Sequence, residues 1–190
     1  DWQPNSSRHR MADFNLPNPS AVLESFLQLR GEQYHLTMSS PLSAPEACSR
    51  LSVQLASGRL SMRTVVQETW STQRAVKTWP ATQRGTWLKA LAAFQSRLHW
   101  HCHFIQKFES EPELEHSNMA RSCDGLREND FDEAKFLAWS TGQTGYPFID
   151  ACMRFLLANG WINFRMRAML VSFAAYDLWL HWQRPAHHLA

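Results

Sequence analysis

Cationic and aromatic residues occur together near position 165 of this 190-residue chain. Arg165 and Arg167 have one residue between them, and Trp161 and Phe164 stand just before them. A guanidinium carries a permanent positive charge and several fixed donors, while an aromatic ring offers a flat apolar face. Fixed donors beside flat rings suit a ligand that is both aromatic and anionic. The sequence therefore predicts a binding site of this kind in the second half of the chain.

Two helices are needed to position these side chains. Pro147 favours the first position of a helix, and Asn159-Gly160 is typical of a left-handed helix end. We therefore expect a first helix between these points. A second helix is expected to open near Asn163 and to run to about Trp182.

Upstream, apolar residues recur at intervals of three and four, which predicts further helices. One begins at Asn18 or soon after and ends near Gly31. The longest begins after Thr86, its expected N-cap, and reaches Glu109. The residues expected to be buried in the first of these helices are Val22, Phe26, Leu27 and Leu29.

The remaining sequence favours an all-α fold, because no window alternates apolar and polar residues over a strand length. Asp130 or Asp132 is expected to cap a short helix that ends near Ser140. Residues 111–129 are acidic and break the helical periodicity, so they predict a loop. Residues 1–16 are polar and irregular and are interpreted as a linker or cut end, with one helical domain over residues 17–190.

Composition limits the class of protein. The hydrophobic fraction is 44%, and no apolar run approaches the roughly 20 residues of a membrane span. Four cysteines without a CxxC pair indicate reduced thiols, so we expect a cytoplasmic protein that does not enter a membrane. Nine of the 17 acidic residues lie within residues 109–133, which leaves the rest basic enough for phosphate contacts.

Two blocks of residues resemble the flavin domain of the DNA photolyase/cryptochrome family. The elements of the family signature are Thr144-Gly145-Tyr146-Pro147, Asp150, Met153-Arg154, Gly160-Trp161, and Arg165 with Arg167. The second block, Cys48-Ser49-Arg50-Leu51-Ser52 followed by Leu55, Gly58, Leu60 and Ser61, resembles the family's T-S-x-L-S segment. The resemblance runs from about Pro19 to Trp182.

The resemblance implies a helical FAD-binding domain. Family members also carry an N-terminal α/β antenna domain and, beyond the last helix, an Asp-x-Asp pair and an asparagine beside the flavin. Neither part matches this sequence, so we expect a domain truncated at both ends and incomplete after Ala190. We expect such a piece to hold FAD weakly or not at all, and the sequence does not indicate an antenna pigment.

By resemblance, the 48–52 block holds the FAD pyrophosphate, since free backbone N–H groups at a helix start attract phosphate. The alternative for Ser49 and Ser52 is plain helix capping. Cys48 stands where the family has a threonine, which would remove one hydroxyl bond to the cofactor. The expected contacts to FAD are Tyr34, Cys48, Ser49, Arg50, Leu51, Ser52, Phe94, Asn163 and Arg167.

A DNA-facing surface is implied by the match of residues 94–107 to the family helix that contacts the substrate. Trp100 corresponds to the tryptophan that stacks on a flipped lesion. Arg97 stands where the family has a glutamate, and His101 where it has an arginine. Arg165 completes the expected DNA contacts. His99 and His103 have the spacing of a zinc pair, but no nearby carboxylate or second cysteine completes a site, so no metal is expected.

Trp182 resembles the middle member of the family's tryptophan electron-transfer chain. Trp179 and Tyr176 precede it at three-residue steps, so we expect all three on one helical face, where they pass electrons or simply pack. Asn129 stands where the outermost tryptophan is expected. Trp182 and Trp100 are therefore the residues expected to serve catalysis.

The function implied by the resemblance is light-driven repair, in which excited reduced FAD donates an electron to a pyrimidine dimer in damaged DNA. We expect it of the full-length protein and not of this piece alone. Arg97 and His101 favour a second possibility, a cryptochrome that signals to an unidentified partner without repairing DNA. A third possibility is a helical scaffold that binds no flavin.

Overall fold

The computed structural model describes residues 17–190, and these residues form helices and no strand, which confirms the all-α prediction. Residues 1–16, the expected linker, lie outside the described part. The first half contains α1 (Pro19–Ser25), the π-helix η2 (Phe26–Arg30), α2 (Tyr34–Thr37), α3 (Ala44–Ala47), α4 (Ser52–Ala56), α5 (Met62–Thr78), α6 (Ala81–Arg84) and α7 (Trp87–Ser110). The second half contains the 3₁₀ turns η3 (Pro112–Glu115) and η4 (Arg121–Cys123), α8 (Glu133–Ser140), α9 (Pro147–Asn159), α10 (Phe164–Ser172), the π-helix η5 (Phe173–Asp177) and α11 (Gln183–Leu189).

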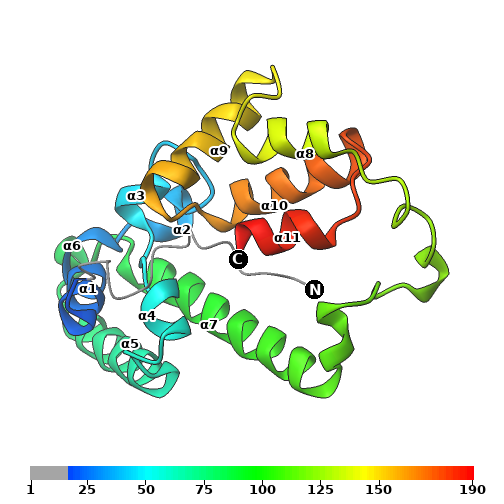
Figure 1. The fold of residues 1–190 in the computed structure, drawn as a ribbon. Coiled ribbons are helices and arrows are strands. Elements are labelled where there is room, and N and C mark those ends of the chain that lie inside the picture. The colour runs from blue at the N-terminus through cyan, green and yellow to red at the C-terminus, as the bar shows by residue number, and fades with distance from the viewer. Residues whose placement is uncertain (1–16) are drawn as a thin grey trace.

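Buried side chains form two separate hydrophobic clusters. The first joins α1, η2, α2, α5 and α7 around residues such as Phe26 and Leu91. The second joins α8 to α11 around Trp139, Met153 and Leu170. In Figure 1 the first cluster lies in the blue-to-green helices and the second in the yellow-to-red helices above them. The candidate residues are therefore divided between two packed lobes.

Several helix boundaries follow the local signals in the sequence. Asn18 caps α1 by accepting the backbone N–H of Ser20 at 2.9 Å. Pro147 is the first residue of α9, and Gly160 ends that helix with φ 61°. Asp132 caps α8 by accepting the N–H of Lys135 at 3.0 Å. These three predictions are confirmed. Each could be made from the sequence because a helix cap depends only on neighbouring residues.

The first predicted helix differs in its buried face. Leu29, expected in the core, is 77% exposed, while Leu23 is buried. The reason is the π-helical turn Phe26–Arg30, which shifts later side chains around the axis relative to a regular α-helix. The same turn directs Arg30 toward residues 46–49, and this contact matters for the candidate site.

The longest helix, α7, has the predicted extent, but Thr86 does not cap it through its side chain. Its hydroxyl instead donates to the carbonyl of Glu32 at 2.7 Å. Thr86 therefore ties the start of α7 to the segment before α2. A capping pattern involves only neighbouring residues, so it could not predict this hydrogen bond to Glu32, which is 54 residues away in the chain.

The predicted last helix, expected to reach Trp182, is wrong beyond Asp177. The helix ends there, Trp179 adopts a left-handed φ of 60°, and α11 starts only at Gln183. Arg127 donates to the carbonyls of Ala175 and Leu180, so a distant side chain satisfies groups at this break. Tyr176, Trp179 and Trp182 therefore do not share one helical face.

The acidic segment between α7 and α8 is irregular, as predicted, with only two short 3₁₀ turns. Figure 1 shows it crossing from the end of α7 to α8 at the right of the view. It returns to the second lobe at Asn118, which contacts Trp182, and at Arg127, which contacts Ala175 in η5 and Leu180 after it. None of the described helices is long and apolar enough to cross a membrane.

Candidate functional site

The 48–52 segment has backbone groups suited to an anion. In the described part of the chain, the backbone N–H groups of Ser49, Arg50, Leu51 and Ser52 donate to no protein acceptor. Arg50 is left-handed at φ 60°, and Leu51 follows in a right-handed conformation at φ −90°. Consecutive N–H groups in such alternating conformations make a concave site for an anion. Ser52, the first residue of α4, is exposed.

Arg30 lies behind this segment and holds its carbonyl groups. Its guanidinium donates to the carbonyl of Ser49 at 2.8 Å and also to that of Cys48. Its Nε donates to Ser25 Oγ at 2.9 Å. Burial lowers the pKa of Arg30, and the nearby charge of Arg50 lowers it further. Two cations therefore lie beside the free N–H groups, and both favour a negatively charged ligand.

Two contacts connect this segment to the start of α10. The guanidinium of Arg50 lies over the ring of Trp161, 4.4 Å from its centroid. Asn163, which is 4% exposed, donates from Nδ2 to the carbonyl of Met38 at 3.1 Å. The two blocks that the sequence singled out are therefore neighbours in space. Asn163, a predicted flavin contact, acts here as a link between the lobes.

Cys48 is half-buried and remains a thiol at neutral pH. Burial raises its pKa to about 11, although the charges of Arg30 and Arg50 oppose the change. Its Sγ lies 3.9 Å from the carbonyl of Met38, as a weak donor would. The side chain thus contacts protein at the position where the family's threonine was expected to contact the cofactor.

Tyr34 and Phe94, both predicted to contact the flavin, are buried together in the first hydrophobic cluster. They are 7% and 3% exposed, and their ring centroids are 5.8 Å apart in an edge-to-face arrangement. Phe26 of η2 contacts both rings edge to face, so the three rings join η2, α2 and α7. Burial raises the pKa of Tyr34 to about 12, with Cys48 adding to the shift and Arg97 opposing it. In this structure the rings pack on protein.

The side-chain hydrogen bond of Arg167 is made to α11 and not to the 48–52 segment. Its guanidinium donates to the carbonyl of Leu189 in α11, and burial lowers its pKa. An arginine starts from so high a pKa that it stays charged. The structure thus uses Arg167 to hold α11 against α10, which the sequence did not indicate.

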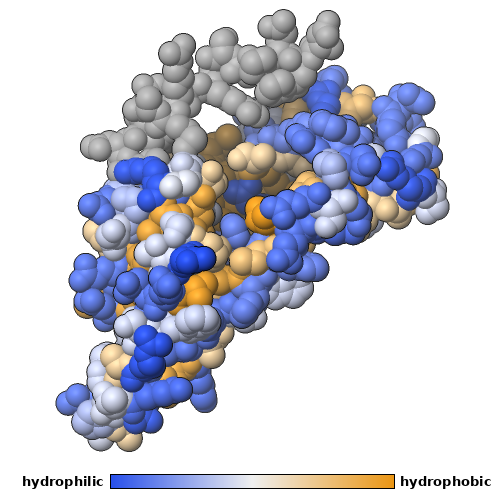
Figure 2. Space-filling model, turned by 90° about the horizontal axis from the view of Figure 1, so that it is seen from below, coloured by the Kyte–Doolittle hydropathy of each residue, from blue (hydrophilic) through white to orange (hydrophobic). Residues whose placement is uncertain are grey.

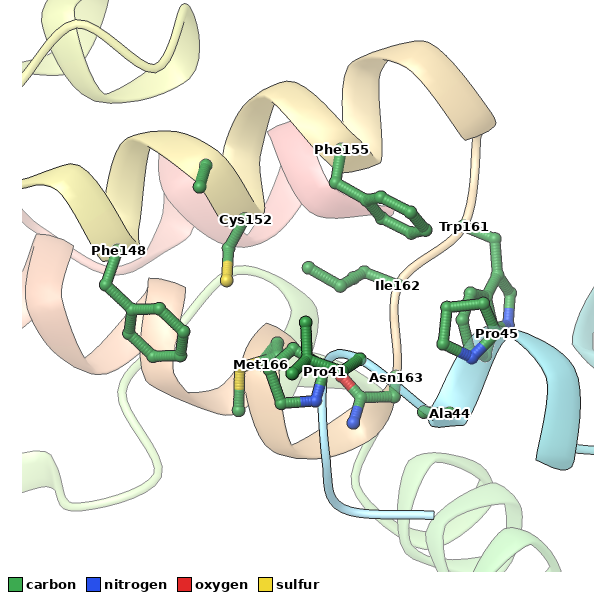
Figure 3. A pocket seen from close by; sticks show the side chains of 12 residues that line it. Pro41, Ala44, Pro45, Phe148, Cys152, Phe155, Trp161, Ile162, Asn163 and Met166 are labelled. Atoms are coloured by element: carbon green, nitrogen blue, oxygen red, sulfur yellow. The ribbon is translucent and has the colours of Figure 1, made fainter. Parts of the chain in front are cut away.

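A cavity of about 260 Å³ lies between residues 41–45 and helices α9 and α10. In Figure 3, Phe148, Cys152 and Phe155 point from α9 toward Pro41 and Met166. The lining is mainly apolar, and the volume is below the roughly 300 Å³ at which drug-sized ligand pockets begin. This cavity does not hold a whole dinucleotide.

A larger cavity of about 650 Å³ lies between the second half of α7, the segment after it and the break before α11. Figure 2 shows the hollowed middle of one face, where apolar side chains gather. Trp182 lines this cavity, with Phe104 and Phe108 from α7. The indole Nε1 of Trp182 donates to Asn118 Oδ1 at 2.7 Å. Neither of the two cavities is lined by Ser49, Ser52 or Arg167.

The predicted DNA contacts on α7 are exposed. Trp100 is 50% exposed, and its ring lies 5.8 Å from that of Phe104 one turn later. Arg97 and His101 are also exposed, as is Arg165 on α10. Within residues 17–190 neither arginine takes part in an ion pair. Both guanidiniums are therefore available to an external anion.

Two contributors to these sites were not found from the sequence. Arg30 follows no motif, and only the π-helical turn brings it to residues 48 and 49. Asn118 lies in an acidic loop without periodicity, 64 residues before its partner Trp182. No local signal marks either residue. Among the described residues, no group of three or more histidine, cysteine or acidic side chains has the arrangement of a metal site.

Comparison with known proteins identifies relatives that match most of the chain. A family model described as the FAD binding domain of DNA photolyase matches residues 94–190. The deoxyribodipyrimidine photo-lyase of Vibrio cholerae is 31% identical over 163 residues, which cover 86% of this chain and 32% of that protein. The chain therefore spans about a third of the length of this curated relative.

Solved structures give the same assignment. A bacterial class III photolyase from Agrobacterium tumefaciens matches with a TM-score of 0.78 and 27% identity, over 90% of this chain and 33% of that one. A cryptochrome from Synechocystis sp. matches with a TM-score of 0.72 and 25% identity, over 90% of this chain and 34% of that one. The chain belongs to the DNA photolyase/cryptochrome family, and its helices form the FAD-binding domain of that family.

Proposed function

We propose that this chain is the cofactor-binding part of a flavoprotein that repairs pyrimidine dimers in DNA by light-driven electron transfer. The observation that carries the proposal is the exposed Trp100 on α7, with Arg97 one turn before it and unpaired by any carboxylate of residues 17–190. An exposed indole beside a free guanidinium can stack on an extruded base and contact its phosphate.

The residues present fit the diphosphate of FAD. Four successive N–H groups, of residues 49–52, donate to no acceptor in the described part of the protein, and the cations of Arg30 and Arg50 lie beside them. We assign to Ser49 and Ser52 the hydroxyl contacts to the diphosphate. When bound, the reduced flavin supplies the electron that splits the dimer. The protein supplies the position of the cofactor and of the extruded base.

Trp182 is assigned the role of electron donor toward the cofactor, because an indole is among the most easily oxidised side chains. It lines the larger cavity and its N–H group is hydrogen bonded. The broken helix removes the predicted stack of Tyr176, Trp179 and Trp182 on one face. Of these three residues, we therefore assign the role to Trp182.

A second function, light signalling without repair, is favoured by one specific feature. Arg97 stands on the exposed face of α7 at the position where the family's repair enzymes are expected to carry a glutamate. A cation there provides no acceptor for the exocyclic amino or imino groups of a damaged base. The similarity to a Synechocystis cryptochrome is compatible with this function.

The test uses the full-length protein, loaded with FAD, reduced and illuminated in the presence of ultraviolet-irradiated DNA. Loss of dimers in the light and none in the dark is the expected result. Retention of flavin with a light-dependent spectral change but no loss of dimers would instead establish signalling. A protein without the visible flavin absorption band would contradict both functions.

Trp100→Ala addresses the proposed DNA contact directly. Base stacking on an aromatic side chain contributes about 1–3 kcal/mol, so affinity for damaged DNA should fall by roughly 5- to 150-fold. Trp70→Ala is the matched control, because Trp70 on α5 is 46% exposed and Trp100 is 50% exposed. Equal affinity in both variants would remove Trp100 from the DNA surface.

A further inference from the structure

The indole of Trp182 is held by one residue of the acidic loop. Its Nε1–H donates to Asn118 Oδ1 at 2.7 Å, which is short for a hydrogen bond from nitrogen to oxygen. Asn118 lies between the two 3₁₀ turns η3 and η4, far from Trp182 in the chain. The loop thus places an acceptor at the edge of the larger cavity, beside a side chain that lines it.

The amide of Asn118 is fixed in one orientation by its other partners. Its Nδ2 donates to Asp124 Oδ1 at 2.8 Å and to Glu128 Oε1 at 3.0 Å. A flipped amide would set its oxygen against two carboxylates and its nitrogen against the indole N–H. The contacts therefore determine which end faces Trp182. All the donors of this amide are used, and its oxygen is directed at the indole.

Negative charge lies directly behind the amide. Backbone N–H groups, first that of Arg127, lower the pKa of Glu128 to about 2, and Asn118 adds to this effect. Glu128 is therefore ionised at neutral pH. His181 also lies beside this carboxylate, with Nε2 3.7 Å from Glu128 Oε1. A donor group bonded to anions becomes polarised, so its own oxygen becomes a stronger acceptor.

We propose that Asn118 is a positioning residue for Trp182, and that it favours loss of an electron from the indole by accepting its N–H hydrogen bond. The inference rests on the proposed function, in which Trp182 donates toward the flavin. In that step one electron leaves Trp182 and the light-excited oxidised flavin gains it, so no bond forms or breaks. The indole becomes a radical cation, whose N–H is a much stronger donor.

The hydrogen bond therefore stabilises the product of the step more than its reactant. A hydrogen bond to a charged group is among the stronger ones in proteins. The carboxylates of Asp124 and Glu128 also stabilise the indole radical cation. They do so by polarising the amide of Asn118 and by their own negative charge. Asn118 thereby sets both the orientation of the indole and the ease of its oxidation.

Three variants of the full-length protein test this role. Asn118→Leu removes the acceptor at similar volume. Asn118→Asp combined with Asp124→Asn exchanges the amide and the carboxylate, so an oxygen still faces the indole and the net charge is kept. Gln183→Leu is the control, because it breaks a neighbouring hydrogen bond, from Gln183 Nε2 to the carbonyl of Glu115 at 3.3 Å, without touching the indole.

The first measurement needs no flavin. The indole N–H signal of Trp182 is assigned in an NMR spectrum by its loss in Trp182→Phe. In Asn118→Leu we expect this signal to move upfield, as for an indole without an acceptor. In Gln183→Leu it should stay near its wild-type position, and in the exchange variant, where a carboxylate accepts the bond, it should not move upfield. An unmoved signal in Asn118→Leu would show that Asn118 does not hold the indole.

The second measurement is the rate at which light reduces the bound oxidised flavin. We expect about a tenfold fall in Asn118→Leu, a wild-type rate in the Gln183→Leu control, and a rate no lower than wild type in the exchange variant, whose acceptor is a carboxylate. Equal rates in Asn118→Leu and wild type would overturn the role of Asn118 alone. If the wild-type protein holds flavin that light does not reduce, the role of Trp182 in the proposed function fails as well. Circular dichroism verifies that each variant is folded.

Discussion

At the scale of single residues, Arg50 shows how this chain departs from ordinary helix capping. A left-handed backbone costs a non-glycine residue about 1–2 kcal/mol, and Arg50 adopts one at φ 60°. Its side chain is stacked on Trp161, and the N–H groups around it donate to no protein atom. Strain of this kind often marks a functional backbone. Here it is consistent with the diphosphate contact proposed above.

A prediction at this scale concerns the two serines. Ser49→Asp together with Ser52→Asp should abolish FAD retention by the full-length protein, because two carboxylates would face the diphosphate. The flavin-to-protein absorbance ratio after purification measures the effect. Normal flavin content in the double variant would contradict the phosphate assignment.

Ser61→Asp is the matched control for that experiment. Ser61 caps α5 by accepting the N–H of Thr64 at 3.0 Å, and aspartate is an equally good cap. The same change of charge at a helix start outside the 48–52 segment should leave flavin retention unchanged.

At the scale of elements, the turn before α9 shows how one carboxylate organises a helix start. Asp150 is 5% exposed and accepts from Thr144 N at 2.8 Å, Thr144 Oγ1 at 2.6 Å and Gly145 N at 3.0 Å. Burial raises the pKa of Asp150, but these hydrogen bonds outweigh burial and leave the pKa below its ordinary value. The turn residues Thr144 and Gly145 of the family signature thus serve the helix that precedes the site.

Asp150→Asn should therefore destabilise the protein in a pH-dependent manner. At neutral pH we expect a loss of about 1–3 kcal/mol in the free energy of unfolding, since a charged acceptor of three bonds is replaced. The folded pKa lies below the unfolded one, so this stability is present above about pH 4 and is lost as the pH falls through the folded pKa.

Urea unfolding across that pH range measures the difference between wild type and Asp150→Asn. The difference should shrink as the solution is acidified. Asp177→Asn is the control, because Asp177 is exposed at the end of η5. A deficit in Asp150→Asn that does not change with pH would show that the hydrogen-bonded charge is not its cause.

At the scale of the whole molecule, two lobes meet at few polar contacts. Asn163 donates to the carbonyl of Met38, and Arg50 stacks on Trp161. The smaller cavity lies beside these contacts and is lined by both lobes. The relative placement of the 48–52 segment and α10, on which a shared cofactor site depends, therefore rests on a small interface.

Asn163→Ala should weaken this interface. Loss of this hydrogen bond leaves the carbonyl of Met38 with only the weak thiol donor of Cys48 and costs about 1–3 kcal/mol, which a thermal or urea melt of the full-length protein detects. Hydrogen exchange should rise on both sides of the interface. Asn159→Ala is the control, because Asn159 is exposed and bonds only to Phe155 within α9. Equal stability of the two variants would mean that the lobes are held by other contacts.

The sequence by itself determined the helical class, the family and the features that depend on neighbouring residues. The start of α9 at Pro147, its end at Gly160 and the cap at Asp132 follow from backbone preferences over a few residues. The resemblance also identified the 48–52 block and the start of α10, which the structure places in contact.

Tertiary structure alone decided the contacts between residues far apart in the chain. Arg127 satisfies carbonyls at the break after Asp177, and a π-helical turn brings Arg30 to the 48–52 segment. Asn118 reaches Trp182 in the same way. Such side chains satisfy backbone and indole groups from tens of residues away, so no local pattern of residues encodes them. Packing of the two lobes selects these partners.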